Sequence, residues 1–242
     1  MIIEGKNSVI EALEGNVTFN KLFIQKGPFD SFTERITILA RERNIPVIFL
    51  DREAFMHESP TKRPQGVIAE VVEYEYSTLE DILNFAKGKK EDPFIVILDG
   101  IEDPHNLGSV IRVCECAGVH GVIIPKNRAV SVNETVIRIS AGAIHYVKVA
   151  RVTNINETIK ELKEQGVWVL AAEAGSQSIY KTNFKGALAL VIGGENTGVK
   201  RLTKELSDLT VSIPMFGEIN SLNASVACGI VLYEAVRQRK GV

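Results

Sequence analysis

Cysteine is scarce in this sequence, and its spacing fits neither a metal site nor a disulfide framework. The chain has three Cys in 242 residues. Cys114 and Cys116 lie within an apolar stretch and Cys228 stands alone, so we expect three buried, reduced thiols. The four His residues also lack the spacing of metal ligands. The sequence therefore predicts a protein without a metal site.

Long apolar runs are also missing. A helix that crosses a membrane needs about 18 or more consecutive apolar residues, and no such run occurs. The first residues, MIIEGKNSVIEALEGN, lack the basic-then-apolar order of a signal peptide. We therefore expect no membrane span and a cytoplasmic location.

The chain has no strong excess of charge of either sign. It carries 28 basic and 30 acidic residues, a formal net charge of −2. This balance does not indicate a nucleic-acid-binding protein, but it does not exclude one, because binding needs only a local basic surface. With 45% hydrophobic and 24% charged residues, the composition is that of a globular protein. Its length suits one large domain or two modest ones.

Two regions differ in their pattern. Residues 1–76 alternate short helix and strand signals and predict a small α/β domain. Residues 77–92 contain a helix-like stretch and the charged run KGKKED, and we interpret them as a linker. Residues 93–242 open with the apolar run FIVIL (94–98), which is typical of a parallel strand buried on both faces. Alternating strands and helices follow, so we expect an α/β domain with a parallel sheet.

Three polar loops follow apolar strands of the second region. In an open α/β sheet, ligands bind beyond the carboxyl ends of the strands. The first loop runs from Asp99 to Arg112 and opens a helix, for which Asn106 or Ser109 would be the starting residue. Taken alone, this loop is also explained by a helix N-cap and a solvated arginine.

The second loop is VIGGENTG (191–198), whose glycines would allow a ligand to approach the backbone. It lacks the GxxxxGK[ST] of a phosphate-binding P-loop, and no GxGxxG occurs, so nucleotide triphosphates and dinucleotides are disfavoured. A simple turn with a solvated Glu195 is the alternative. The third loop, IPMFGEINSLNASVA (213–227), ends at the start of the last helix. One N-cap explains one of its polar residues but not all of them.

Together the three loops resemble the SpoU/TrmH-type RNA ribose methyltransferases, a branch of the knotted methyltransferase superfamily. The segments that carry the resemblance are NLGSVIR (106–112), GGENTG (193–198) and SIPMFGEINSLNASVA (212–227). The opening IEGKNSVIEAL and PQGVIAEV (64–71) resemble the RNA-binding domain of the bacterial 23S ribosomal RNA guanosine 2′-O-methyltransferase subgroup. That subgroup often has His-Gln-Gly where this chain has Pro64-Gln65-Gly66.

The resemblance implies a fold and a reaction. Residues 1–76 would form a domain like ribosomal protein L30e, and residues 93–242 a catalytic domain with a deep trefoil knot. The cofactor would be S-adenosyl-L-methionine, bound at Gly193, Ile213 and Leu222. The catalytic positions would be Asn106, Arg112, Glu195, Ser221 and Asn223, with Arg112 engaging a substrate phosphate and assisting deprotonation of the ribose.

We therefore expect methylation of a ribose 2′-hydroxyl, with a guanosine of 23S ribosomal RNA as the target. Alternatives are the same chemistry on another ribosomal nucleotide or on transfer RNA, or a non-catalytic RNA-binding or ribosome-assembly protein. The resemblance also implies a homodimer whose active site is completed across the subunit interface. The last helix, 224–239, is a candidate for that interface, although it suits an intramolecular core helix equally well.

Overall fold

The computed structural model describes residues 2–14, 19–28, 30–62, 64–71, 74–195 and 197–241. The chain divides into two compact units, Met1–Glu75 and Tyr76–Val242. Each unit has its own sheet and its own buried core.

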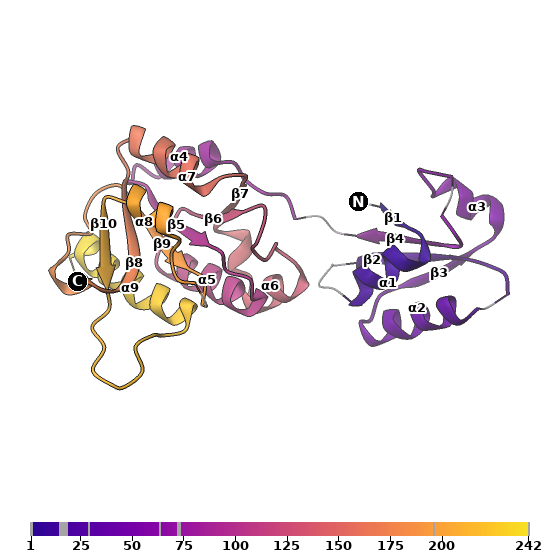
Figure 1. The fold of residues 1–242 in the computed structure, drawn as a ribbon. Helices are drawn as coiled ribbons and strands as arrows, with labels where there is room; N and C mark the ends of the chain where they lie inside the picture. The colour runs from indigo at the N-terminus through magenta and orange to yellow at the C-terminus, as the bar shows by residue number, and fades with distance from the viewer. Residues whose placement is uncertain are drawn as a thin grey trace. The chain divides into compact units, whose positions relative to one another are not determined.

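The first unit is a four-stranded sheet with helices packed against it (Figure 1). Its strand order is β1-β4-β2-β3, in which β4 runs antiparallel to β1 and β2, and β2 runs parallel to β3. The apolar sides of α1 and α2, including Val9, Leu13 and Ile36, are buried against strand residues such as Leu22 and Val67. The elements are β1 (Ile2–Glu4), α1 (Lys6–Glu14), β2 (Phe19–Gln25), α2 (Ser31–Glu42), β3 (Val47–Leu50), α3 (Arg52–His57) and β4 (Val67–Val71).

The second unit is built on a six-stranded sheet in which every pair of neighbours is parallel. The strand order is β10-β8-β9-β5-β6-β7. This confirms the predicted α/β fold with a parallel sheet. Its strands are β5 (Phe94–Asp99), β6 (Gly121–Pro125), β7 (Lys148–Val152), β8 (Trp168–Ser178), β9 (Leu188–Gly193) and β10 (Leu209–Ser212).

Helices cover both faces of this sheet (Figure 1). The helices α4 (Leu79–Gly88) and α7 (Ile155–Glu164) share a buried core with β5 and β8, and α5 (Pro104–Cys116) packs against α9 (Ala224–Lys240) on the other face. All six residues of β5 are buried, as the run FIVIL predicts. The remaining elements are α6 (Glu134–Ile139), α8 (Arg201–Leu206) and the 3₁₀ turns η1 (Ala143–His145) and η2 (Ile179–Lys181).

The structure differs from the predicted linker over residues 77–92. These residues lie in the second unit and contain α4, whose Ile82 is completely buried in the core of that unit. A capping box fixes the start of α4, because Thr78 and Asp81 bond to each other's backbone and side chain. The charged run KGKKED (87–92) therefore contains the end of a core helix and does not join two domains.

Two smaller expectations are also corrected. Cys114 and Cys228 are buried thiols, but Cys116 is exposed because it lies on the outer side of α5. That helix begins at Pro104 with Asp103 as its N-cap, so Asn106 lies within the first turn and does not start the helix. Proline at the first helical position has no N–H to leave unpaired, which explains the earlier start.

Among the described residues, no helix is long and apolar enough to cross a membrane. Within the same part of the chain, no group of three or more His, Cys, Asp or Glu side chains is arranged to hold a metal ion.

Candidate active site

The three polar loops meet beyond the carboxyl ends of the sheet. The strands β5, β9 and β10 end at Asp99, Gly193 and Ser212, and because all strands are parallel these ends lie at the same edge. The loop after β5 leads into α5, the loop after β9 into α8, and the loop after β10 into α9. The three loops therefore lie together at one edge of the sheet, as the sequence predicts.

Asp99, at the end of β5, bonds to the loop after β9. The sequence analysis assigned this residue no role. Its carboxylate is buried and accepts hydrogen bonds from the backbone N–H of Lys200 at 3.0 Å and from Lys200 Nζ at 2.6 Å. The Gly194 N–H also donates to the Asp99 carbonyl at 3.2 Å. The signal in the sequence is an acidic residue at the end of an apolar strand. A carboxylate buried there needs hydrogen-bond or ionic partners.

The turn after β9 requires its two glycines. A Cβ atom on Gly193 would lie 2.0 Å from the carbonyl carbon of Gly198, and one on Gly194 would lie 2.5 Å from the Gly100 oxygen. Gly194 and Gly198 pair as an antiparallel bridge, so the turn folds back on itself. Any side chain would push the turn away from β5, and this close approach explains the residue type.

Three of the predicted catalytic residues form one hydrogen-bonded network. Asn106 is nearly completely buried, and its Nδ2 donates to Glu195 Oε1. The Nδ2 of Asn223 donates to Asn106 Oδ1 at 2.9 Å and to Glu195 Oε1 at 3.2 Å. The network thus joins one residue from each of the three loops.

The orientation of the Asn223 amide is fixed by its second task. Asn223 is the N-cap of α9, and its Oδ1 accepts from the backbone N–H of Ser225 at 2.9 Å and from Ser225 Oγ at 2.6 Å. With the oxygen turned to the helix, the NH₂ group must face Asn106 and Glu195. The helix cap therefore determines which atoms Asn223 presents to the network.

An apolar cavity of about 330 Å³ lies beside this network. The three predicted cofactor positions, Gly193, Ile213 and Leu222, all line it, as do Glu195 and Ser221. Apolar walls with a few polar groups suit an adenosine and a thioether, and the volume is in the range of small-molecule sites. Further lining residues are Ala172, Glu173, Ala174, Ile192, Gly194, Gly198, Val211, Ser212, Met215, Asn220, Ala224 and Ala227.

A second, polar hollow of about 130 Å³ adjoins the first. It is lined by Ile101, Asp103 and Asn106 from the loop after β5, and by Thr197 from the loop after β9. Gly194 and Glu195 line both hollows. An apolar and a polar compartment therefore meet at the Glu195 carboxylate.

Arg112 is not part of the network. It lies on α5, six residues after Asn106, which is about 9 Å along the axis and about 120° around it. Its side chain is exposed and makes no hydrogen bond or ion pair with any other residue that the structure describes. Ser221 lines the cavity and likewise has no hydrogen bond to another described residue. The structure thus brings together Asn106, Glu195 and Asn223 but leaves Arg112 apart.

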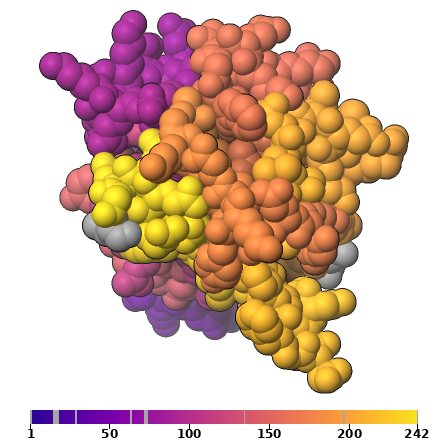
Figure 2. Space-filling model, turned by 90° about the vertical axis from the view of Figure 1, so that its left-hand side faces the viewer, coloured from indigo at the N-terminus to yellow at the C-terminus, as the bar shows by residue number. Residues whose placement is uncertain are grey.

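The loop after β10 exposes apolar side chains. Figure 2 shows this loop standing out from the surface, and Phe216 is 97% and Ile219 is 77% exposed. On the following helix, Val226 and Tyr233 are about half exposed, whereas Val231 and Leu232 are buried within the unit. The helix therefore combines an intramolecular core face with an exposed apolar side.

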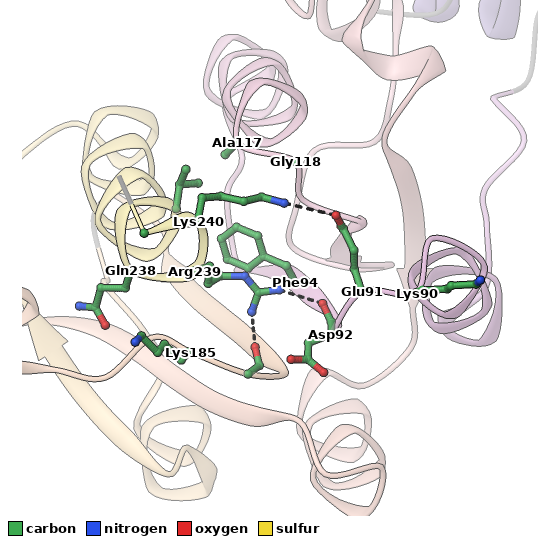
Figure 3. Close-up of a pocket in the computed structure, with 13 residues that line it drawn as sticks. Lys90, Glu91, Asp92, Phe94, Ala117, Gly118, Lys185, Gln238, Arg239 and Lys240 are labelled. Carbon is green, nitrogen blue, oxygen red and sulfur yellow. Dashed lines mark hydrogen bonds and ion pairs between the residues drawn. The ribbon is translucent and has the colours of Figure 1, made fainter.

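The larger hollow in Figure 3, of about 610 Å³, lies at the opposite end of the sheet, beside the start of β5. Its central side chain, Arg239, donates to the carbonyls of Gly186 and Asp92, the latter at 2.8 Å, and lies 4.8 Å over the Phe94 ring. These bonds fasten the end of α9 to two loops. The arginine donors are engaged by backbone, so we regard this hollow as structural.

Comparisons with known proteins agree with this geometry. The SpoU rRNA Methylase family matches residues 93–233, and the family described as RNA 2′-O ribose methyltransferase substrate binding matches residues 2–77. A Bacillus subtilis protein, YacO, named for the TrmH family of tRNA/rRNA methyltransferases, is 42% identical over 240 residues, which are 98% of this chain and 96% of that protein. A similarly named Staphylococcus haemolyticus protein is 42% identical over 243 residues, covering 100% and 97% of the two chains.

Solved structures with similar folds include two that contain the methyl donor. The SpoU methyltransferase AviRb of Streptomyces viridochromogenes, in complex with S-adenosylmethionine, superposes with a TM-score of 0.65 and 26% identity over 100% of this chain and 91% of that chain. An S-adenosylmethionine-bound rRNA methyltransferase of Sinorhizobium meliloti superposes with a TM-score of 0.62 and 26% identity over 98% and 86%.

Proposed function

Because this chain belongs to the SpoU rRNA methylase family, we propose that it methylates a ribose 2′-hydroxyl group of RNA, with a guanosine of 23S ribosomal RNA as its target. It is an RNA methyltransferase, and its methyl donor is S-adenosylmethionine. The choice of guanosine rests on the sequence resemblance alone, and the choice of ribose rests on the resemblance and on the site geometry. We also propose that the enzyme acts in the cytoplasm.

The observation that carries this proposal is the network of Asn106, Glu195 and Asn223 at the boundary of two hollows. We assign the apolar hollow, with Gly193, Ile213 and Leu222, to the cofactor. We assign the polar hollow beside Asn106 to the ribose that is methylated. The hydroxyl oxygen and the methyl group then meet at Glu195, the residue that lines both.

Each polar residue has a role that its chemistry allows. When bound, the cofactor supplies a methyl group that is already activated, so this chain must only position and deprotonate the hydroxyl. Asn106, Glu195 and Asn223 hold one another rigidly and present polar atoms to the ribose. The Ser221 hydroxyl, which bonds to no other described residue, lies on the cavity wall and offers a further contact. Arg112 binds the substrate phosphate and favours loss of the hydroxyl proton through its charge.

Arg112 can take this role in a homodimer, which we propose for this enzyme. It lies off the face of α5 that carries Asn106, so an Arg112 supplied from outside the subunit suits the site better. Phe216, Ile219, Val226 and Tyr233 provide an exposed apolar surface on the loop after β10 and on α9. Burial of such residues is the usual basis of a subunit interface.

The first unit, by its match to substrate-binding domains, is proposed to bind RNA with an L30e-like fold. We expect the exposed segment around Lys62 to contribute positive charge there, while Lys62 Nζ itself donates to the Met56 carbonyl at 3.0 Å. We place the domains at Met1–Glu75 and Tyr76–Val242, so that α4 belongs to the second. We also propose the family's trefoil knot, formed by the segment after β10 whose residues 213–222 reach back to the turn after β9.

The test is a map of 2′-O-methyl groups in ribosomal and transfer RNA from cells with and without the gene. We expect one guanosine of 23S RNA to lose its methyl group in the deletion strain and to regain it with the wild-type gene. A change confined to transfer RNA would contradict the target and leave the chemistry intact. Loss of a base methyl group in place of a ribose methyl group would contradict the chemistry.

A further inference from the structure

Strand β8 contains a wide bulge that faces the cofactor cavity. Its neighbour β10 pairs Thr210 with Ala171, but the next residue, Val211, pairs with Gln177. Pairing between β8 and β9 also ends at Ala171. Residues 172–176 therefore leave both ladders, and Gly175 adopts φ +77° within the bulge.

The bulge turns Glu173 toward the cavity. Glu173 lines the apolar hollow together with Ala172 and Ala174, and its side chain is half-buried. One oxygen, Oε1, accepts from Lys204 Nζ at 2.8 Å. The other, Oε2, lies 3.6 Å from where a Cβ atom of Gly198 would stand, so it faces the turn after β9. That oxygen has no hydrogen-bond partner among the described residues.

We infer that Glu173 accepts hydrogen bonds from the ribose hydroxyl groups of the cofactor's adenosine. The inference rests on the proposed placement of the cofactor in the apolar hollow. Of the two carboxylates that line this hollow, Glu195 is held by the amides of Asn106 and Asn223 at the boundary with the polar hollow, whereas Glu173 lines the apolar hollow alone. An ionised carboxylate is an acceptor only, so its ligand must be a donor.

The neighbouring cation selects among the donors that the cofactor carries. Lys204 already neutralises Glu173 at 2.8 Å, and its ammonium group would repel a second ammonium group placed beside the same carboxylate. Neutral hydroxyl groups meet no such repulsion. The adenine ring is apolar on both faces and suits the walls formed by Ile192, Val211 and Leu222. The two ribose hydroxyl groups lie between the adenine ring and the amino-acid part of the cofactor. They are therefore the partners of Glu173.

Calorimetry with three ligands tests this assignment in the full-length chain. We use S-adenosylmethionine, S-adenosylhomocysteine and 5′-methylthioadenosine, which share the adenosine, whereas the last lacks the amino-acid part. Glu173→Gln should raise the Kd of all three by one common factor of roughly ten or more, because a charge-assisted bond becomes a neutral one.

Two control variants separate ligand binding from support of the fold. Lys204→Met breaks the same ion pair but leaves Glu173 in place, so its affinity for 5′-methylthioadenosine should stay within about threefold of wild type. Glu205→Gln, on the exposed side of α8, should change nothing. If Lys204→Met weakens binding as much as Glu173→Gln does, Glu173 acts only through its ion pair and the inference is overturned.

Other outcomes also overturn it. Weaker binding of S-adenosylmethionine with unchanged binding of 5′-methylthioadenosine would place Glu173 at the amino-acid part, and unchanged binding of all three would remove it from the site. Leu222→Trp, which fills the hollow, tests the cofactor placement itself. If Leu222→Trp abolishes binding while Glu173→Gln does not alter it, the placement stands and only the role of Glu173 falls. If Leu222→Trp binds normally, both fail.

Discussion

Asn106 and Asn223 are separated by 117 residues in the chain, and their side chains are joined by a 2.9 Å hydrogen bond. Asn106 belongs to the first turn of α5, and Asn223 caps α9. Both amides also donate to the same oxygen of Glu195. The starts of two helices that pack against each other are therefore joined by hydrogen bonds to the glycine turn after β9.

Asn223 serves both the fold and the network, and substitutions should separate the two. Asn223→Ser keeps a cap for α9 but leaves Asn106 Oδ1 without its donor, so we expect a loss of about 1–3 kcal/mol of stability and methyl transfer lowered by roughly tenfold or more. Asn223→Ala should lose the cap as well, at about 1 kcal/mol. Urea unfolding and single-turnover methyl transfer measure the two effects. A fully active Asn223→Ser enzyme would show that the network is only structural.

Arg112 is expected to matter for the reaction and not for folding. It is exposed and has no partner among the described residues, so Arg112→Ala should change the free energy of unfolding by no more than about 0.5 kcal/mol. The rate of methyl transfer should fall by roughly 10² or more, and Arg112→Lys should not restore it because an ammonium group lacks the planar fork of donors. Arg201→Ala, another exposed arginine, is the matched control. Retention of more than about a third of the wild-type rate would refute the proposed role.

His120 should make the second unit less stable as the pH falls. Its Nδ1 accepts from the Phe94 N–H at 3.0 Å, and its Nε2 lies 3.1 Å from Glu91 Oε2, so the neutral ring with a proton on Nε2 fits. Burial lowers the pKa of His120 below its ordinary value of 6.5. The unfolded chain therefore binds the proton first, and the stabilisation is present above about pH 6.5 and is lost as the pH falls below it.

The slope should not exceed about 1.4 kcal/mol per pH unit for this single proton. The measurement is the free energy of unfolding between pH 7 and pH 5. Glu91 does not titrate in this window, because Lys240 and His120 hold its pKa below 4.5. His120→Asn should be less stable at pH 7 and should show a flatter dependence on pH. An equal slope in the two proteins would assign the effect to other groups.

Arg239 should contribute strongly to the stability of the second unit. Arg239→Met leaves the carbonyls of Gly186 and Asp92 without their donor, so we expect a loss of about 1–3 kcal/mol in urea unfolding. Lys240→Met is the control, because Lys240 is largely exposed and its 3.3 Å pair with Glu91 should contribute little. Equal effects of both changes would contradict the role given to the guanidinium.

The boundary of the catalytic unit can be tested with fragments. Residues 76–242 retain α4 and should fold and bind S-adenosylmethionine, because the proposed cofactor residues all lie in this unit. Residues 90–242 lack Ile82, which is completely buried against β6 at Gly121, and should be markedly less stable. Calorimetry and thermal unfolding of the two fragments make the comparison. Equal stability of the two fragments would show that residues 77–89 are a linker and not part of the catalytic unit.

The sequence by itself determined the class of the second unit and the content of its site. The buried run at 94–98 and the alternation after it predict a parallel sheet, because local burial patterns depend on nearby residues. The ends of these apolar strands predict where the polar loops lie, since ligand sites are found beyond the strand ends in such sheets. Gly193 and Gly194 were readable as a tight turn for the same local reason.

Only the tertiary structure decided which groups meet. The bond of Asp99 to Lys200, the bulge that brings Glu173 to the cavity, and the burial of Ile82 of α4 each depend on partners far away in the chain. Likewise, the burial of Asn106 within the network and the exposure of Arg112 on the same helix follow from how α5 packs against its neighbours. Such contacts arise from packing between elements, where the free energy of burial and hydrogen bonding selects one arrangement among many that the local pattern allows.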